Sequence, residues 1–381
     1  MPQFAANLIF DGQRFIKNAY ISIDEGGTVY YVSNEGEALI EKQGLSFYNG
    51  ILCPGFVNAH CHLELSGNTL FKSKEKSLAK FIEHVRANRN AKPNLKKIKL
   101  YDRIMFENGI SLVGDVSNTD ITCEIKQKSK IKYHTFVELS GLDNNTSLAQ
   151  YRRGENILQT FKNNGLTARL SLHSLYSVSD KLFKLVSSRG EEVLSIHFME
   201  SPEELELFSN QSGSLFYMMK SIFADFKPLV CDIDQIAVTL KGLNSSQLIL
   251  VHNLMLKNRL LADKNVKYCL CPNSNMIISG QLPDKNFIKS IANKFIIGTD
   301  SIVSNNNLCI LSEIKTLAEN YDFLKLAELL QAATLNGAKA LKCDDNYGSF
   351  EIGKKPGVIL IEGVDLKNFK LTDDSVVKRL I

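Results

Sequence analysis

A regular alternation of short apolar runs with segments of helical length constrains this chain most, from about residue 50 to residue 340. The runs are ILCPGFVNAH (51–60), ISLVGDVS (110–117), KYHTFVELSG (132–141), ARLSLHSLYS (168–177), VLSIHFMES (193–201), LILVHNL (248–254), VKYCLCPNSN (266–275) and KFIIGTDS (294–301). Apolar runs between turn residues are typical of strands buried on both faces, and their alternation with helices indicates parallel βαβ units. Eight such units fit a closed barrel.

The segments between the runs support this interpretation. SLAKFIEHVRANR and NLCILSEIKTLAEN carry apolar residues at the spacing of amphipathic helices. Ser179 and Asp180 suit helix N-caps, and Gly109 and Gly190 suit the position just after a helix. A long, open, doubly wound sheet is the rival architecture, but no glycine-rich phosphate-binding fingerprint follows any of the runs. We therefore predict the α/β class and a TIM-like (β/α)8 barrel.

The two ends of the chain depart from this pattern. Residues 1–50 and 344–381 have period-two character and turn glycines. Because the ends of a barrel lie near each other, we expect the two segments to combine in one small β-sandwich domain. The predicted organisation is a composite β-sandwich of residues 1–50 and 344–381, with the barrel over residues 51–343.

Composition narrows the class of protein. The chain is 44% hydrophobic and 23% charged, close to globular averages. Its 45 basic and 41 acidic residues are spread along the chain, and its lysine-rich segments resemble solvated helix faces, which argues against nucleic-acid binding. The start lacks a signal-peptide pattern, and no window has the roughly 18 apolar residues of a membrane span. We expect a cytoplasmic protein that binds neither nucleic acid nor membrane, and a homodimer is compatible with the sequence.

The eight cysteines are scattered and lie mostly in apolar segments, so we interpret them as reduced packing residues.

Unusual polar residues collect at the carboxyl ends of the predicted strands, where a βα barrel builds its active site. They are His60, His62, His173, His197, Glu200, His252 and Asp300. Residues two apart in a strand face the same side, so we expect His60 and His62 to face the barrel axis and Cys61 to face outward. Three neutral imidazoles, from His60, His62 and His197, plus the carboxylate of Asp300 form the donor set of an open catalytic zinc site.

Six motifs occur in the order PGFVNAHCHLE, HFMESPEE, LVHN, CPNSN, GTDS and GSFEIGKKPGVILIEG. Together they resemble the amidohydrolase superfamily in its metal-dependent deaminase and chlorohydrolase branch, from about residue 50 to the end. The resemblance implies that His60, His62, His197 and Asp300 are the metal ligands. Members with two metals usually bridge them with a carboxylated lysine on strand four, and ARLSLHSLYS has no lysine. We expect one divalent ion; zinc is preferred, and iron and manganese are alternatives.

The resemblance also implies a hydrolytic deamination. The metal lowers the pKa of a bound water from about 15.7 towards about 7, and the resulting metal-bound hydroxide attacks the amino-bearing ring carbon. Asp300 then accepts a proton from the water, His252 hydrogen-bonds the attacking oxygen, and Glu200 protonates a ring nitrogen before ammonia leaves. Purely structural roles stay open: His252 as a core histidine, and Glu200 as an acid favoured at a helix N-terminus.

Four further residues are candidates for substrate binding: Glu64, His173, Tyr176 and Ser304. If the backbone stays extended past His62, Glu64 lies at the pocket rim, where it accepts hydrogen bonds from a ribose or an amino group. A salt bridge from Glu64 to Arg86 or Arg89 is the alternative. His173 and Tyr176 either shape the pocket or only pack, and we treat His84 and His134 as structural.

The runs NAHCHLELS and GTDS…SNN resemble the branch that deaminates 6-aminopurine nucleosides. The implied substrate is of the aminodeoxyfutalosine, adenosine, methylthioadenosine or S-adenosylhomocysteine type. Guanine deaminase, cytosine deaminase, imidazolonepropionase and chlorohydrolase activities are the alternatives within the superfamily. A non-catalytic, metal-free scaffold is the alternative outside enzymes.

Overall fold

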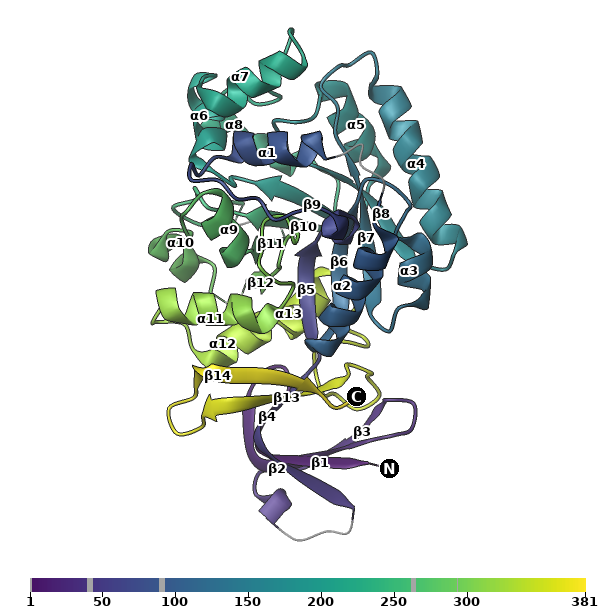
Figure 1. Cartoon of the computed structure of the whole chain (residues 1–381), viewed down its shortest axis with the longest axis vertical. Coiled ribbons are helices and arrows are strands. Elements are labelled where there is room, and N and C mark those ends of the chain that lie inside the picture. Colours follow the sequence, from purple (N-terminus) through teal and green to yellow (C-terminus); the bar gives the residue numbers. More distant parts are fainter. Residues whose placement is uncertain (1, 40–43, 89–92, 262–264, 293) are drawn as a thin grey trace.

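Eight parallel strands form the centre of the molecule in the computed structural model, which describes residues 2–39, 44–88, 93–261, 265–292 and 294–381 (Figure 1). They pair in two four-stranded sheets, in the orders β5-β6-β7-β8 and β12-β11-β10-β9. Their bounds are β5 Phe56–Cys61, β6 Ile110–Ser117, β7 Lys132–Leu139, β8 Thr167–Leu172, β9 Val193–Phe198, β10 Gln247–His252, β11 Val266–Leu270 and β12 Phe295–Ile297. Each of the eight predicted runs therefore contributes one of these parallel strands.

Two seams close the sheets into a barrel. Between β12 and β5, the carbonyl oxygen of His60 accepts hydrogen bonds from the backbone N–H groups of Thr299 and Asp300, both at 3.0 Å. Between β8 and β9, the hydroxyl of Ser171 accepts from the N–H of Ser195 at 2.9 Å and donates to its carbonyl oxygen. The predicted (β/α)8 barrel is thus confirmed.

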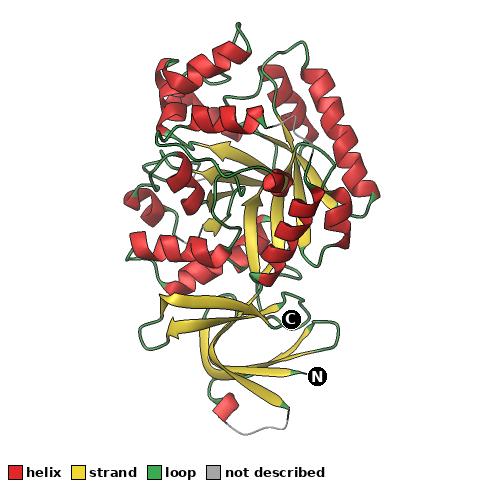
Figure 2. Ribbon diagram, viewed as in Figure 1, coloured by secondary structure: helices red, strands yellow, loops and turns green. Residues whose placement is uncertain are grey.

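Helices surround these strands (Figure 2). Their bounds are α1 Leu78–Ala87, α2 Leu95–Glu107, α3 Cys123–Lys128, α4 Ser147–Asn163, α5 Asp180–Arg189, α6 Pro202–Asn210, α7 Gly213–Ile222, α8 Ile233–Lys241, α9 Pro272–Ile278, α10 Lys285–Ser290, α11 Ile310–Asn320, α12 Leu326–Ala332 and α13 Leu335–Ala340, with short 3-10 helices η1 Glu37–Leu39 and η2 Leu63–Gly67. The predicted caps of α5 are present, because Ser179 Oγ accepts from Leu182 N at 3.2 Å and Gly190 has a φ of 73°. Within the described residues, no helix is long and apolar enough to cross a membrane.

The two ends of the chain meet in one six-stranded sheet beside the barrel (Figure 1). Its order is β14-β13-β4-β1-β2-β3, with bounds β1 Gln3–Phe10, β2 Phe15–Ile23, β3 Val29–Val32, β4 Leu45–Pro54, β13 Val358–Asp365 and β14 Lys370–Arg379. Alternate residues of β4 face two different hydrophobic cores. Ile51 and Cys53 pack into the core that surrounds the barrel strands. Leu52 packs into a separate core of the terminal sheet, together with Val358 and Leu360. The predicted pairing of the two ends is confirmed, while the division into domains at residues 50 and 344 stays a prediction.

The first predicted run, residues 51–60, is in fact two strands. Residues up to Pro54 pair with β13 in the terminal sheet, and the barrel strand begins at Phe56. The break falls at Gly55, where an added Cβ atom would overlap the hydroxyl of Ser111. Only glycine permits this close approach, and an unbroken apolar run gives no sign of it.

Gly298, just after β12, allows the seam beside His60 to close. A Cβ atom here would lie 2.8 Å from His60 Cβ and 2.9 Å from Cys269 Sγ. We expect Gly298→Ala to lower the free energy of unfolding by about 1–3 kcal/mol, measured by denaturant titration, because strands must move apart. Gly141→Ala is the control, since its Cβ would make an ordinary contact at 3.4 Å. Equal losses in the two variants would contradict the prediction.

Candidate metal centre and active site

An irregularity in β5 turns the two histidines of its end into the barrel. Val57 and Ala59 belong to the interior cluster, so strict alternation would point Cys61 inward. The pairing with β6, however, advances three residues from Asn58 to Cys61 while β6 advances two. This bulge puts Cys61 in the outer core and leaves its two histidine neighbours to face the axis. Burial raises the pKa of the Cys61 thiol well above its usual value, which disfavours a thiolate nucleophile.

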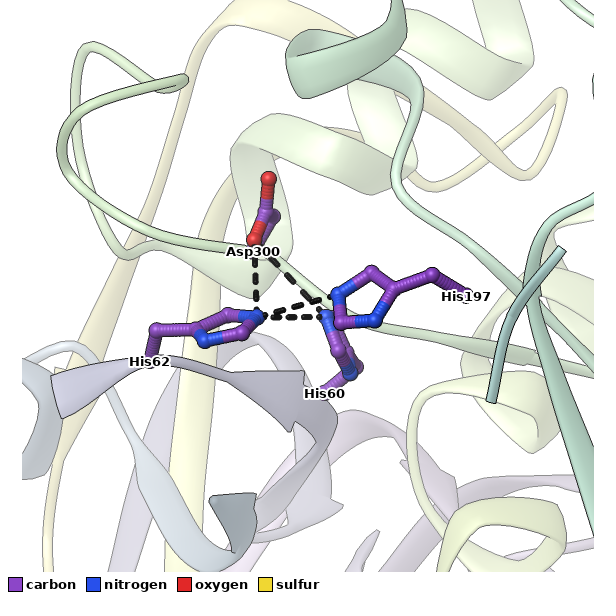
Figure 3. A group of neighbouring side chains, drawn as sticks. All are labelled: His60, His62, His197 and Asp300. Carbon is purple, nitrogen blue, oxygen red and sulfur yellow. Dashed lines mark hydrogen bonds and ion pairs between the residues drawn. The ribbon is translucent and has the colours of Figure 1, made fainter. Parts of the chain in front are cut away.

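The four residues predicted as ligands converge at the carboxyl ends of the strands (Figure 3). His62 Nε2 lies 3.2 Å from His60 Nε2 and 3.1 Å from His197 Nε2. Asp300 Oδ1 lies 3.7 Å from His60 Nε2 and 3.5 Å from His62 Nε2. Ligand atoms around a tetrahedral zinc with bonds of about 2.0–2.1 Å lie about 3.3 Å apart, so the spacing of these donors fits one ion.

The protonation of the imidazoles also suits a metal. Burial lowers the pKa of His60 to about 4 and that of His197 well below its usual value, so both rings are neutral near pH 7. The Nδ1–H of His197 donates to the carbonyl oxygen of His173 at 3.1 Å. This hydrogen bond leaves the lone pair of His197 Nε2 facing the other donors.

Hydroxyl groups orient the carboxylate of Asp300. Its Oδ2 accepts hydrogen bonds from Ser274 Oγ at 2.7 Å and from Ser304 Oγ, which leaves Oδ1 to face the histidines. The hydroxyl of Ser304, a predicted substrate contact, is fully buried against Asp300, and its contact with a substrate stays a prediction. Ser304 lies four residues after Asp300, and the intervening turn folds back on the carboxylate. Sequence reasoning missed Ser274, which lies at the start of α9 within the CPNSN motif.

Glu200 and His252 face each other beside this cluster. Glu200 Oε1 lies 3.6 Å from His252 Nε2. The Nδ1–H of His252 donates to Asn275 Oδ1 at 2.9 Å, so Nε2 is unprotonated, and it has no hydrogen-bond partner among the described residues. Burial, reinforced by the charge of Asp300, raises the pKa of Glu200 well above its usual value. The protonated form of Glu200 is therefore favoured, and in this form the side chain can donate a proton.

The position predicted for Glu64 is wrong, because η2 begins directly after His62 and the backbone is not extended there. The Glu64 carboxylate accepts from Asn118 N at 3.0 Å, from Thr119 N at 3.2 Å and from Thr119 Oγ1 at 3.0 Å. These bonds connect the loop after β5 to the loop after β6 and take the place of the predicted pair with Arg86. The other predicted partner, residue 89, lies outside the described residues.

His173, Tyr176 and Glu138 line one side of the cluster. The ring of His173 lies 4.8 Å from that of His197 and 5.9 Å from that of Tyr176, measured between centroids. Glu138 Oε1 lies 3.4 Å from His197 Nδ1, and Glu138 Oε2 accepts from Asn118 Nδ2 at 3.1 Å. Sequence reasoning missed Glu138, although its position near the carboxyl end of the third run was an available signal.

Glu138, His173 and His197 also have donor atoms close enough to hold a cation. The Nδ1–H of His197 already donates to the carbonyl oxygen of His173, however, so this nitrogen has no lone pair to offer. We interpret Glu138 and His173 as a polar wall beside one metal site and not as a second metal site.

Comparison with known proteins agrees with this geometry. The model of the amidohydrolase family matches residues 51–381. An adenosine deaminase of Helicobacter pylori is 30% identical over 327 residues, which are 81% of this chain and 78% of the relative. The solved structure of H. pylori aminofutalosine deaminase in complex with methylthio-coformycin has a TM-score of 0.79 at 23% identity, covering 95% of this chain and 92% of that one.

A zinc-bound adenosine deaminase from Xanthomonas campestris has a TM-score of 0.71 at 20% identity, covering 96% of this chain and 85% of that one. At these identities the solved structures establish the fold. The family match and the H. pylori sequence go further and agree with the resemblance seen in the motifs. The chain belongs to the amidohydrolase family.

Proposed function

We propose that this protein is a metal-dependent hydrolytic deaminase of an aminopurine nucleoside. The observation that carries the proposal is a buried acid, Glu200, placed beside His252 and next to three imidazoles and a carboxylate that converge on one point. Similar proteins named adenosine deaminase and aminofutalosine deaminase support the substrate class.

The metal site fits one divalent ion, and we propose zinc. Three neutral imidazoles with one carboxylate match the ligands that zinc prefers, and the X. campestris relative has zinc bound. His60, His62, His197 and Asp300 would hold the ion. When bound, it supplies a nucleophile at neutral pH by lowering the pKa of water.

The protein side chains then move the protons. Glu200 gives its proton to a ring nitrogen, which makes the adjacent amino-bearing carbon more electrophilic. As water adds to that carbon, Asp300 accepts a proton and His252 Nε2 accepts a hydrogen bond from the attacking oxygen. Asp300 passes its proton to the amino group, the carbon–nitrogen bond breaks and ammonia leaves. The proton of the added hydroxyl returns to Glu200 as the carbonyl product forms.

The polar wall supplies candidate contacts to the rest of the substrate. We propose that His173, Tyr176 and Glu138 face the nucleoside, because His173 and Glu138 lie beside His197 and Tyr176 lies beside His173. Glu64 would act from behind this wall, since its carboxylate holds Asn118, whose amide in turn holds Glu138. The cytoplasmic location and the homodimer stay predictions.

A substrate panel tests the proposed function. Adenosine, methylthioadenosine, S-adenosylhomocysteine, aminodeoxyfutalosine, guanine and cytosine are each incubated with the zinc-loaded protein, and ammonia release is measured. We expect the largest kcat/KM for one of the four nucleosides. Turnover of guanine or cytosine alone would replace the substrate class, and no ammonia from any compound would contradict deamination itself.

A further inference from the structure

A fully buried ion pair lies behind the strand that carries two of the proposed ligands. Lys126 Nζ of α3 is 2.6 Å from Asp115 Oδ2 of β6, and neither side chain is exposed to solvent. The ammonium group also donates to Ser117 Oγ at 3.0 Å and to Thr135 Oγ1 at 2.9 Å. All three of its protons are therefore used, and its orientation is determined.

Stability alone is a weak explanation for such a pair. Removing two charges from water is costly, and apolar side chains of similar volume often stabilise a core as well as a buried ion pair does. The second oxygen of Asp115 has a more specific partner: Oδ1 accepts the backbone N–H of Leu63 at 2.7 Å. Leu63 directly follows the proposed ligand His62 in the chain.

The backbone changes direction at this point. Strand β5 ends at Cys61, which lies opposite Asp115 in the sheet, and η2 begins at Leu63. The first N–H groups of a helix have no partner within the helix, so the Leu63 N–H needs an acceptor from elsewhere. The Asp115 carboxylate provides it, while the carbonyl of His60 is held from the other side by Thr299 and Asp300.

We propose that Asp115 is a positioning residue for the metal ligand His62, acting through the N–H of Leu63, and that Lys126 neutralises the buried charge of its carboxylate. The inference rests on the proposed function, since it assumes that His62 binds the metal. The hydrogen bond to Asp115 fixes the peptide group between His62 and Leu63, and this restricts the backbone that carries the His62 ring. The same turn also places Glu64, so the wall beside His197 depends on it.

Two double variants separate positioning from packing. D115N/K126M and D115L/K126M both remove the two charges and keep similar volumes, but only asparagine keeps an oxygen for the Leu63 N–H. The zinc dissociation constant of the full chain is measured by competition with a chelator, with the Tm of the metal-free protein as the control for folding. We expect the asparagine variant to bind zinc within about threefold of the wild type. The leucine variant should bind about 10–100-fold more weakly, the usual effect of losing a residue that orients a metal ligand.

Equal zinc dissociation constants for the two folded double variants would overturn the inference. If D115L/K126M does not fold, D115A/K126M is measured in its place, because alanine lacks the acceptor and cannot clash with the strand. A wild-type protein that binds no zinc, iron or manganese would contradict the proposed function itself. Tight binding by the wild type, with the same constant in all double variants, would contradict the positioning role alone.

Discussion

We expect Glu200→Gln to lower kcat for deamination by about three orders of magnitude while leaving the metal content unchanged. Glutamine keeps the size of the side chain but has no acidic proton, and a positioned general acid contributes about 10²–10⁴-fold to rate. Burial and the charge of Asp300 raise the pKa of Glu200 and so favour its protonated form. The substitution therefore removes a proton that the native side chain carries. The kcat is measured by steady-state kinetics with the best nucleoside of the panel, and the metal content is measured by metal analysis of the same sample.

Glu206→Gln is the matched control, because Glu206 is an exposed carboxylate on α6, the helix that begins just after Glu200. We expect its kcat to stay within about twofold of the wild type, as for most surface substitutions. Loss of the metal in Glu200→Gln would show that Glu200 is a ligand, and a kcat near that of the wild type would show that another group provides the proton.

We expect His62→Ala to prevent metal binding and, with it, measurable turnover. His62 Nε2 is the central donor, because it lies within 3.2 Å of His60 Nε2 and of His197 Nε2 and 3.5 Å from Asp300 Oδ1. Without it, two imidazoles and one carboxylate are left, one donor fewer than the four that converge here, and the lost donor is the one that lies close to all three others. Less than about a tenth of an equivalent of metal per chain after chelator treatment and dialysis is the expected result.

A second buried histidine serves as the control for this substitution. His134 lies inside the barrel near its other end, where Nδ1 donates to the carbonyl oxygen of Leu341 at 3.0 Å. His134→Gln should lower the Tm, because it disturbs a buried hydrogen bond, and should keep a full equivalent of metal. Full metal content in His62→Ala would contradict the proposed ligand set.

Several features of the site could be predicted because they follow from local patterns. Apolar runs that alternate with amphipathic segments indicate parallel strands with helices between them, and the ends of such strands meet at one face of a barrel. His197 and Asp300 could therefore be grouped with His60 although they are far apart in the sequence. The structure places their donor atoms within 4.8 Å of one another.

The prediction for Glu64 failed for a physical reason. It rested on an extended backbone beyond His62, and residues two apart share a side only while a strand continues. A 3-10 turn at Leu63 ends the strand, and the acceptor that stabilises this turn is Asp115, 52 residues later in the chain. The hydrogen bond from Ser304 to Asp300 could not be predicted either, because a hydroxyl near a ligand gives no local sign of its partner.

The sequence by itself determined the number and order of the barrel units, the association of the two ends in one β domain, and the identity of the four residues that meet at the strand ends. The sequence also predicted that His60 and His62 face the barrel axis, and only the tertiary structure showed which contacts orient the ligands. The bulge in β5 turns His60 and His62 inward, the buried charge of Asp115 holds the turn after them, and hydroxyl groups orient Asp300. Each of these depends on contacts between segments far apart in the chain. Hydrophobic periodicity reports only whether a residue is buried, not which partner it meets.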